Sequence, residues 1–283
     1  MERVKKILKV VSITFCFLII GIYALFVYFS SPYSDRDLLE KFDKFPQKPT
    51  IEYQKFKNFN YRTLKIIKDT SLPTLVFIHG TIGSCSNFIK YMSDDELLQK
   101  FNMIAYDRIG YNYNEKHHVQ ESISFEKSLV EDLIKNIPSE KIILVGYSYG
   151  GPIALAVKKK LNKIILIAPA VYSKVEPIPW VLNFYKWKLT RWLVPKIWKE
   201  ASKEKISHIK DLQNFEQNWK STTNNVTCIH GNADWIVPYS NSEFLQDQFP
   251  KEQFELITIQ NAGHDLVWSE FPSIKQQLLN QSN

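Results

Sequence analysis

The chain has 283 residues, of which 45% are hydrophobic and 23% charged, so it is long enough and apolar enough to build a substantial core. This balance excludes disorder over most of the chain. The net charge of +7 does not indicate a nucleic-acid partner, because the basic residues are spread along the chain without a nucleic-acid-binding motif.

The N-terminal region contains an apolar run without a charged residue, from Val10 to Phe29. About 20 such residues are enough to cross a hydrocarbon core about 30 Å thick. We therefore predict that residues 1–30 form an uncleaved signal-anchor helix in contact with membrane lipid. A signal peptide cleaved near Pro32 is the alternative. Large aromatic side chains stand where its cleavage site would need small ones, which favours the anchor.

Flanking charge predicts the orientation of this helix. Four basic residues precede or begin it: Arg3, Lys5, Lys6 and Lys9. Three acidic residues dilute the positive charge that follows it: Asp35, Asp37 and Glu40. Basic flanks stay on the cytoplasmic side, so we expect a single-pass protein of the cell membrane with its large domain on the outer side. Residues 31–49 are predicted to be a polar tether with a short amphipathic stretch.

Short apolar runs alternate with longer amphipathic ones over the rest of the chain. The apolar runs predict strands: Leu75–Ile78, Met103–Tyr106, Ile142–Val145, Ile164–Ile167, Val226–Ile229 and Phe254–Ile259. The amphipathic runs predict helices: Phe125–Ile137, Pro152–Lys160, Asn241–Gln248 and Leu266–Leu279. Strands without polar alternation are covered on both faces, which is typical of a doubly wound, mostly parallel α/β sheet. Thr50–Asn58 and Tyr61–Lys68 alternate more clearly and predict an antiparallel pair that opens the sheet.

The sequence G-Y-S-Y-G at residues 146–150 lies between a predicted strand and a predicted helix. A G-x-S-x-G sequence in this context is a nucleophile elbow, in which a tight, strained turn pushes the serine hydroxyl out above the sheet. Ser148 is therefore the candidate nucleophile. The same turn aims the backbone N–H of Tyr149, at the start of the helix, at a developing oxyanion.

A serine nucleophile needs a base, and the base needs an acid that orients it. His264 follows the last predicted strand, and Asp234 follows the strand before it, so both lie on loops at the edge of the sheet where Ser148 is expected. The chain order Ser, Asp, His matches that of α/β-hydrolases. We predict His264 as the base and Asp234 as the acid. Glu176 and Asp265 are the competing carboxylates.

The loop after the strand Leu75–Ile78 is the expected source of a second oxyanion donor. We predict the backbone N–H of Thr81, with that of Gly80 as the alternative. Three further polar residues of these loops are predicted to be structural: His79, Asp107 and Arg108. Charged hydrogen bonds of the last two would tie neighbouring loops together.

Five segments, in this order and at these intervals, carry a family resemblance: HGTIGS, YDRIGYN, GYSYGG, HGNADWIVP and AGHD. As a set, over about residues 50 to 280, they resemble the α/β-hydrolase superfamily. They are most similar to its esterases, proline iminopeptidases and C–C-bond hydrolases that carry a helical cap. The resemblance implies an α/β-hydrolase core at residues 50–170 and 223–283, with the cap inserted after the sixth strand at residues 171–222. Dehalogenases and epoxide hydrolases would need a carboxylate at Ser148.

The predicted cap contains five of the seven tryptophans and twice as many basic as acidic residues. One interpretation is a helical lid whose aromatic side chains pack on the core. The other is a lid that touches anionic lipid and admits apolar substrates, because aromatic and basic residues favour membrane interfaces. Either lid would exclude water from the oxyanion.

The resemblance implies acyl transfer to water through an acyl-enzyme on Ser148. We expect a hydrolase of carboxylic esters with small to medium apolar acyl groups. A peptidase, amidase or acyltransferase on the same triad is an alternative, as is a non-catalytic binding protein with the hydrolase fold. Neither a cofactor nor a metal is predicted, because Cys16, Cys85 and Cys228 lack metal-binding spacing. A Cys85–Cys228 disulfide is less favoured than two unpaired thiols, since Cys228 is expected to be buried.

Overall fold

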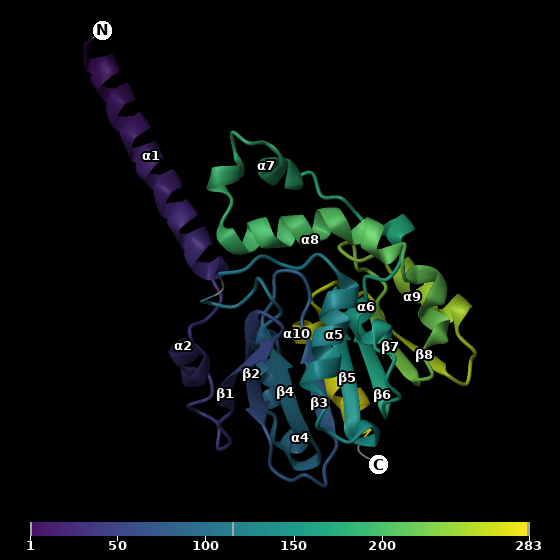
Figure 1. Ribbon diagram of the computed structural model, residues 1–283. Helices are drawn as coiled ribbons and strands as arrows, with labels where there is room; N and C mark the ends of the chain where they lie inside the picture. The colour runs from purple at the N-terminus through teal and green to yellow at the C-terminus, as the bar shows by residue number, and fades with distance from the viewer. Residues whose placement is uncertain (1, 115, 282–283) are drawn as a thin grey trace.

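The computed structural model describes residues 2–114 and 116–281 and contains a single eight-stranded sheet (Figure 1). The strands are β1 (Thr50–Phe56), β2 (Phe59–Ile66), β3 (Thr74–Ile78), β4 (Asn102–Tyr106), β5 (Ile142–Tyr147), β6 (Lys163–Ile167), β7 (Val226–Gly231) and β8 (Phe254–Ile259). Their order across the sheet is β1-β2-β4-β3-β5-β6-β7-β8. Strands β1 and β2 are antiparallel to their neighbours, and all other pairs are parallel. The predicted opening pair and mostly parallel sheet are confirmed.

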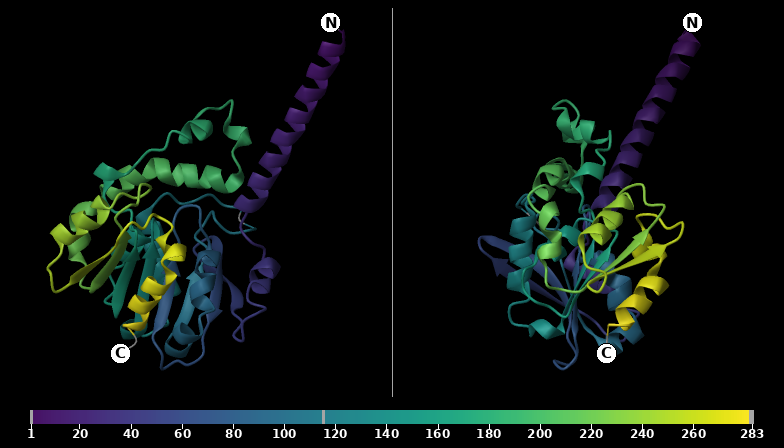
Figure 2. Two further views of the ribbon diagram at one scale, coloured as in Figure 1. Left: turned by 180° about the vertical axis from the view of Figure 1, so that it is seen from behind. Right: turned by 90° about the vertical axis from the view of Figure 1, so that its right-hand side faces the viewer.

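Helices cover both faces of this sheet, as the edge-on view in Figure 2 shows. One layer contains α5 (Ile123–Leu133), α6 (Gly150–Ala156) and α9 (Ser240–Gln248). The other contains α3 (Ile89–Met92), α4 (Asp95–Lys100), α10 (Leu266–Ser269) and α11 (Phe271–Leu279), with the 3₁₀ turn η1 (Cys85–Phe88). Successive side chains of β3 enter opposite layers, so Val76 and Ile78 pack in the first and Leu75 and Phe77 in the second. All four are fully buried, which explains the unbroken apolar run.

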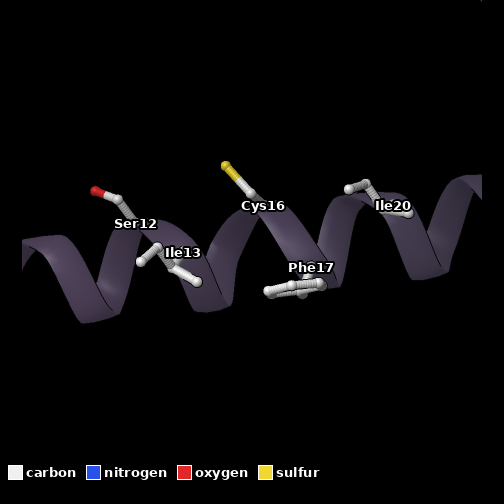
Figure 3. A pocket seen from close by; sticks show the side chains of 5 residues that line it. All are labelled: Ser12, Ile13, Cys16, Phe17 and Ile20. Atoms are coloured by element: carbon white, nitrogen blue, oxygen red, sulfur yellow. The ribbon is translucent and has the colours of Figure 1, made fainter.

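The N-terminal helix α1 (Glu2–Ser30) projects from the domain, and none of its side chains is buried (Figure 1). It is the one helix in the described part of the chain that is long and apolar enough to cross a membrane. Figure 3 shows one of its faces, where Ser12, Ile13, Cys16, Phe17 and Ile20 alone line a shallow, almost wholly apolar groove. By length and composition, a membrane anchor and a signal sequence both fit this helix.

Residues 31–49 differ from the predicted tether, because the structure packs part of this segment against the domain. Leu38 of helix α2 (Asp35–Glu40) packs in the second layer of the core, and so does Phe42. Both side chains are fully buried. The guanidinium of Arg62 on β2 donates to the Asp35 carboxylate at 2.8 Å and to the carbonyl of Tyr33 at 2.9 Å. The two apolar side chains and the buried arginine thus make the segment part of the folded unit.

Several predicted helices are shorter in the structure. Helix α5 ends at Leu133 rather than Ile137, and α6 covers residues 150–156 rather than 152–160. The predicted helix 266–279 is broken into α10 and α11 around Glu270. Pro272 explains this break, because a proline ring inside a helix clashes with the carbonyl four residues earlier. His264 lies before this break, on the connection between β8 and α10.

Between β6 and β7 the chain crosses over the carboxyl ends of the strands (Figure 1). This region contains α7 (Leu182–Lys186) and the long helix α8 (Lys196–Leu212), with the 3₁₀ turns η3 (Ser173–Val175), η4 (Arg191–Leu193) and η5 (Glu216–Ser221). A last 3₁₀ turn, η2 (Ser139–Lys141), precedes β5. The side chain of Asn241 fixes the start of the crossing segment, accepting from the N–H groups of Val171 and Tyr172 at 2.8 and 2.9 Å. We keep the name cap for residues 171–222, which lie between β6 and β7.

Candidate active site

Ser148 occupies the turn between β5 and α6 with a backbone φ of +54°. This left-handed conformation is strained for a non-glycine residue, and such strain clusters at functional turns. The turn is so tight that a Cβ at Gly146 would lie 2.4 Å from the carbonyl oxygen of Gly150. Gly80 approaches from the next loop, where a Cβ would lie 2.7 Å from that of Ser148. The structure therefore gives Ser148 the backbone geometry that the sequence predicted.

The three residues predicted as a triad lie in hydrogen-bonding line. Nε2 of His264 lies 3.0 Å from Oγ of Ser148, and its Nδ1 lies 2.7 Å from Oδ2 of Asp234. A carboxylate only accepts, so Nδ1 carries the proton and Nε2 is left to accept from the Ser148 hydroxyl. Ser148 and Asp234 are buried, and His264 is half-buried. The imidazole takes Asp234 as its partner rather than either competing carboxylate.

The Asp234 carboxylate is held by more than the predicted base. Its Oδ1 accepts the backbone N–H groups of Ile236 at 2.9 Å and Val237 at 2.8 Å, and its Oδ2 lies 3.2 Å from Nε2 of His230. Burial by itself raises the pKa of Asp234, but the hydrogen bonds from His230 and His264 outweigh it and hold that pKa well below its usual range. Asp234 therefore stays ionised and fixed in direction.

His230 was not predicted as a site residue. Its Nε2 faces two acceptors, the Asp234 carboxylate and the carbonyl of Val237 at 3.0 Å, so this nitrogen carries the proton. Its Nδ1 then accepts the hydroxyl proton of Ser242 at 2.6 Å. A histidine four residues before the acid, at the end of the preceding strand, was the only sequence signal for this contact.

Tyr147 is a second residue that the sequence analysis missed. Its hydroxyl donates to the backbone carbonyl of His264 at 2.8 Å, and its ring stacks on the imidazole at 5.2 Å between centroids. Both contacts limit the rotation of the base. The residue lies beside the nucleophile in the elbow, but its partner is 117 residues away in sequence, so no local pattern reveals the pairing.

The loop after β3 borders Ser148, since a Cβ at Gly80 would lie 3.3 Å from the Ser148 hydroxyl oxygen. The backbone N–H groups of Thr81 and Tyr149 have no hydrogen-bond acceptor among residues 2–114 and 116–281. His79 fixes this loop, since its Nδ1 lies 2.7 Å from the carbonyl of Gly80 and its Nε2 accepts the N–H of Arg108 at 3.0 Å. The structural role predicted for His79 fits these contacts.

A buried ionic cluster joins this loop to the cap. Arg108 donates two hydrogen bonds to Glu204 on α8, at 2.7 and 2.8 Å. The same carboxylate accepts the hydroxyls of Tyr111 at 2.8 Å and Thr81 at 2.6 Å. Burial raises the pKa of Glu204, but its contacts with Arg108 lower that pKa overall, so the carboxylate is ionised. The loop-tying role expected of Arg108 therefore extends to the cap.

The remaining predicted polar residues lie away from the triad. Asp107 accepts from Nε of Arg62 at 2.7 Å and from the N–H of Cys85 at 2.8 Å, so it ties loops as expected. Glu176 is paired with Lys205 of α8. Cys85 and Cys228 are buried, separate thiols. Among the described residues there is no cluster of three or more His, Cys, Asp or Glu side chains that could hold a metal ion.

Comparisons with known proteins agree with this architecture. A family model described as the alpha/beta hydrolase fold matches residues 73–192. An uncharacterized protein of Mycobacterium tuberculosis (strain ATCC 25618 / H37Rv) is 28% identical over 130 residues, which cover 44% of this chain and 37% of that protein. The match thus spans little more than a third of the length of this curated relative.

Two solved structures are similar over most of the chain. A candidate lipase from Acinetobacter baumannii AYE has a TM-score of 0.65 at 14% identity, covering 88% of this chain and 95% of that one. A membrane phospholipase A, described as a bacterial virulence factor, has a TM-score of 0.63 at 15% identity, covering 100% of this chain and 99% of that one. At such identities the likeness shows the fold. Together with the family match over residues 73–192, it shows that the chain has the α/β-hydrolase fold.

Proposed function

We propose that the chain is a serine hydrolase that cleaves carboxylic esters with small to medium apolar acyl groups. The observation that carries the proposal is the line from Ser148 Oγ through the His264 imidazole to Asp234, with contacts of 3.0 and 2.7 Å. A hydroxyl in this position is activated by the adjacent base, and the base is oriented by an ionised acid. The match to the alpha/beta hydrolase fold model over residues 73–192 supports hydrolysis as the reaction class.

In the proposed reaction Oγ of Ser148 attacks the ester carbonyl carbon while Nε2 of His264 takes the hydroxyl proton. The N–H groups of Tyr149 and Thr81 donate to the oxyanion, and Asp234 stabilises the imidazolium. The proton then passes to the leaving alkoxide, which departs as an alcohol. A water molecule, deprotonated by His264, attacks the acyl-enzyme and releases the carboxylic acid.

Covalent labelling of the full chain in detergent with a fluorophosphonate tests the nucleophile. We expect an adduct on Ser148, none in Ser148→Ala, and a greatly slowed reaction in His264→Ala. Turnover of aryl esters should fall as far in each single variant as in the double variant, by up to about a millionfold, because the residues act as a unit. An unlabelled, folded protein would instead indicate a binding protein. Labelling with turnover of aminoacyl amides but not esters would indicate a peptidase or amidase.

We further propose that α1 is an uncleaved anchor that keeps the domain on the outer side of the cell membrane. The exposed apolar surface of α1 and the basic residues at its start support this placement. Membrane fractionation with mass spectrometry of the native N-terminus tests the anchor. A soluble protein beginning near Pro32 would show a cleaved signal peptide. C-terminal reporter fusions test the orientation, and a cytoplasmic domain would contradict it.

A further inference from the structure

The outer surface of the cap exposes an unusual number of large apolar side chains. We call the six that lie between residues 180 and 192 the cap patch: Trp180, Val181, Phe184, Trp187, Leu189 and Trp192. Leu189 is 85% exposed, and Trp180 and Trp192 are 72% and 71% exposed. Scattered apolar residues are normal on a protein surface, but a gathered group of this size marks an interaction site.

Hydrogen bonds from side chains to backbone carbonyls within the segment hold the patch in place. Nε of Arg191 donates to the carbonyl of Tyr185 at 2.6 Å, and the Thr190 hydroxyl donates to that of Phe184 at 2.8 Å. The rings of Trp180 and Phe184 lie 6.0 Å apart. The apolar side chains therefore belong to a folded turn and are exposed on its surface, not buried in the core.

Helix α1 lies against the same cap. The indole N–H of Trp198, in the first turn of α8, donates to the Ser30 hydroxyl at 3.0 Å, and its ring lies 5.5 Å from that of Phe26. Figures 1 and 2 show that α1 and the segment around α7 rise from the same end of the domain in every view. A bilayer that holds α1 would therefore lie at the same end of the domain as the segment that carries the patch.

The charge of the cap fits such a surface. Residues 170–222 contain ten Lys and Arg residues against five Asp and Glu residues. Four of the five acids are buried, and they are Glu176, Glu200, Glu204 and Glu216. Lys186 and Lys188 are exposed among the tryptophans. Glu204 pairs with the buried Arg108, and Glu176 and Glu200 pair with Lys205 and Lys203 of α8. None of these acids pairs with Lys186 or Lys188, which keep their positive charge for anionic headgroups.

We propose that the cap patch inserts into the interface of the bilayer that holds α1, with Lys186 and Lys188 against anionic lipid headgroups, and that the site takes acyl esters of membrane lipids. Tryptophan is enriched at this depth because its ring is apolar and its N–H is polar. The second statement rests on the proposed hydrolase function, whereas the first does not. Helix α8 links the two, since it follows the patch and its Glu204 binds Thr81 beside Ser148.

Depth-dependent quenching tests the insertion. The full chain, carrying Cys16→Ser and either Leu189→Cys or Asn136→Cys, is labelled with the dye NBD and placed in nanodiscs. These contain an equimolar mixture of phosphatidylcholine and phosphatidylglycerol, with some lipid bearing a nitroxide near the headgroup. Asn136 is exposed in the loop before β5 and serves as the control. We expect strong quenching at position 189 and little at 136. Equal quenching at both positions, or protection of position 189 by a second copy or another protein, would overturn the proposal.

Activity measurements test the lipid substrate separately from the insertion of the cap patch. Trp187→Ser with Leu189→Ser and Trp192→Ser should lower phospholipid hydrolysis in vesicles of the same mixture by at least about tenfold, with aryl ester turnover in detergent unchanged. Lys186→Gln with Lys188→Gln should do so only when phosphatidylglycerol is present. Wild-type turnover of aryl esters without phospholipid hydrolysis would overturn the lipid substrate. Failure of both substrates would count against the hydrolase function while leaving the quenching result to decide the insertion.

Discussion

The hydroxyl of Thr81, in the loop beside Ser148, donates to Glu204 on the cap helix α8 at 2.6 Å, although 123 residues separate the two in sequence. The contact joins the predicted oxyanion loop to the element that covers the site. Arg108 also donates two hydrogen bonds to the Glu204 carboxylate, so the oxygen that accepts from Thr81 is fixed in position. The cap and the oxyanion loop should therefore act as one piece.

Replacing Thr81 by valine removes this hydroxyl and keeps the shape of the side chain. We expect kcat for an aryl ester to fall about tenfold with little change in KM, because the backbone N–H at position 81 loses its fixed direction; losing an oxyanion donor outright costs about a hundredfold or more. Thr81→Ser keeps the hydroxyl and should stay near wild type. Steady-state kinetics of wild type, Thr81→Val and Thr81→Ser tests this prediction. Equal kcat values for the two variants would show that the contact does not position the donor.

The acid is tested by a matched pair of carboxylate substitutions. Asp234→Asn should lower kcat on the order of ten-thousandfold, since an amide cannot hold His264 in the required tautomer. Glu176→Gln removes a charge that pairs with Lys205 and should leave kcat nearly unchanged. A damaging Glu176→Gln beside a silent Asp234→Asn would reverse the assignment of the acid.

The contribution of Tyr147 can be separated from its stability effect. Tyr147→Phe loses the hydrogen bond to the His264 carbonyl but keeps the ring, and we expect kcat to fall about tenfold. Tyr91→Phe loses a similar bond, 2.6 Å long, to the carbonyl of Val267. Each variant should lose about 1 kcal/mol of unfolding free energy, but only Tyr147→Phe should lose activity. Equal kcat values in the two variants would mean that the bond orients nothing.

Glu126 predicts a pH-dependent stability. Burial raises its pKa from 4.5 to about 7, although Arg108 opposes the shift. The folded state then binds more protons than the unfolded state between these values, so its unfolding free energy falls as pH rises through this window. One pKa unit corresponds to about 1.4 kcal/mol, so the loss relative to Glu126→Gln approaches about 3 kcal/mol.

Unfolding of the full chain in detergent at a series of pH values checks this prediction. Glu126→Gln cannot titrate and should show a weaker decline than wild type across the window. Glu140→Gln, at an exposed position before β5, should follow wild type. A wild-type curve parallel to that of Glu126→Gln would show that Glu126 does not bind the extra proton.

The parts of the molecule that local sequence patterns encode were predictable. The apolar runs became buried strands because each residue of β3 or β5 is covered on one face or the other. Ser148, Asp234 and His264 each follow a strand, and parallel strands end at the same edge of a sheet, so their convergence followed from topology.

Contacts that depend on three-dimensional proximity were not predictable. Leu38 and Phe42 lie in a stretch of sequence rich in charge. Only the folded structure, in which both pack in the second layer of the core, shows that they are core residues. Likewise, Glu204 reads in sequence as one charge on an amphipathic helix, and nothing near it indicates Arg108 or Thr81 as partners. The helix ends were misplaced because Pro272 and local turns override the apolar pattern.

The docking of residues 31–49 has a mechanical consequence for an anchored protein. Arg62 donates hydrogen bonds to the Tyr33 carbonyl and the Asp35 carboxylate. Only Ser31 and Pro32 lie between α1 and Tyr33, so no long flexible linker joins the helix to the domain. In an anchored protein its height and orientation above the bilayer would follow the tilt of α1, whose uncharged run Val10–Phe29 spans about 30 Å, close to the hydrocarbon thickness. Long helices meet thinner bilayers by tilting more. Turnover of membrane-borne substrate should therefore vary with lipid chain length, while turnover of soluble ester in the same bilayers should not.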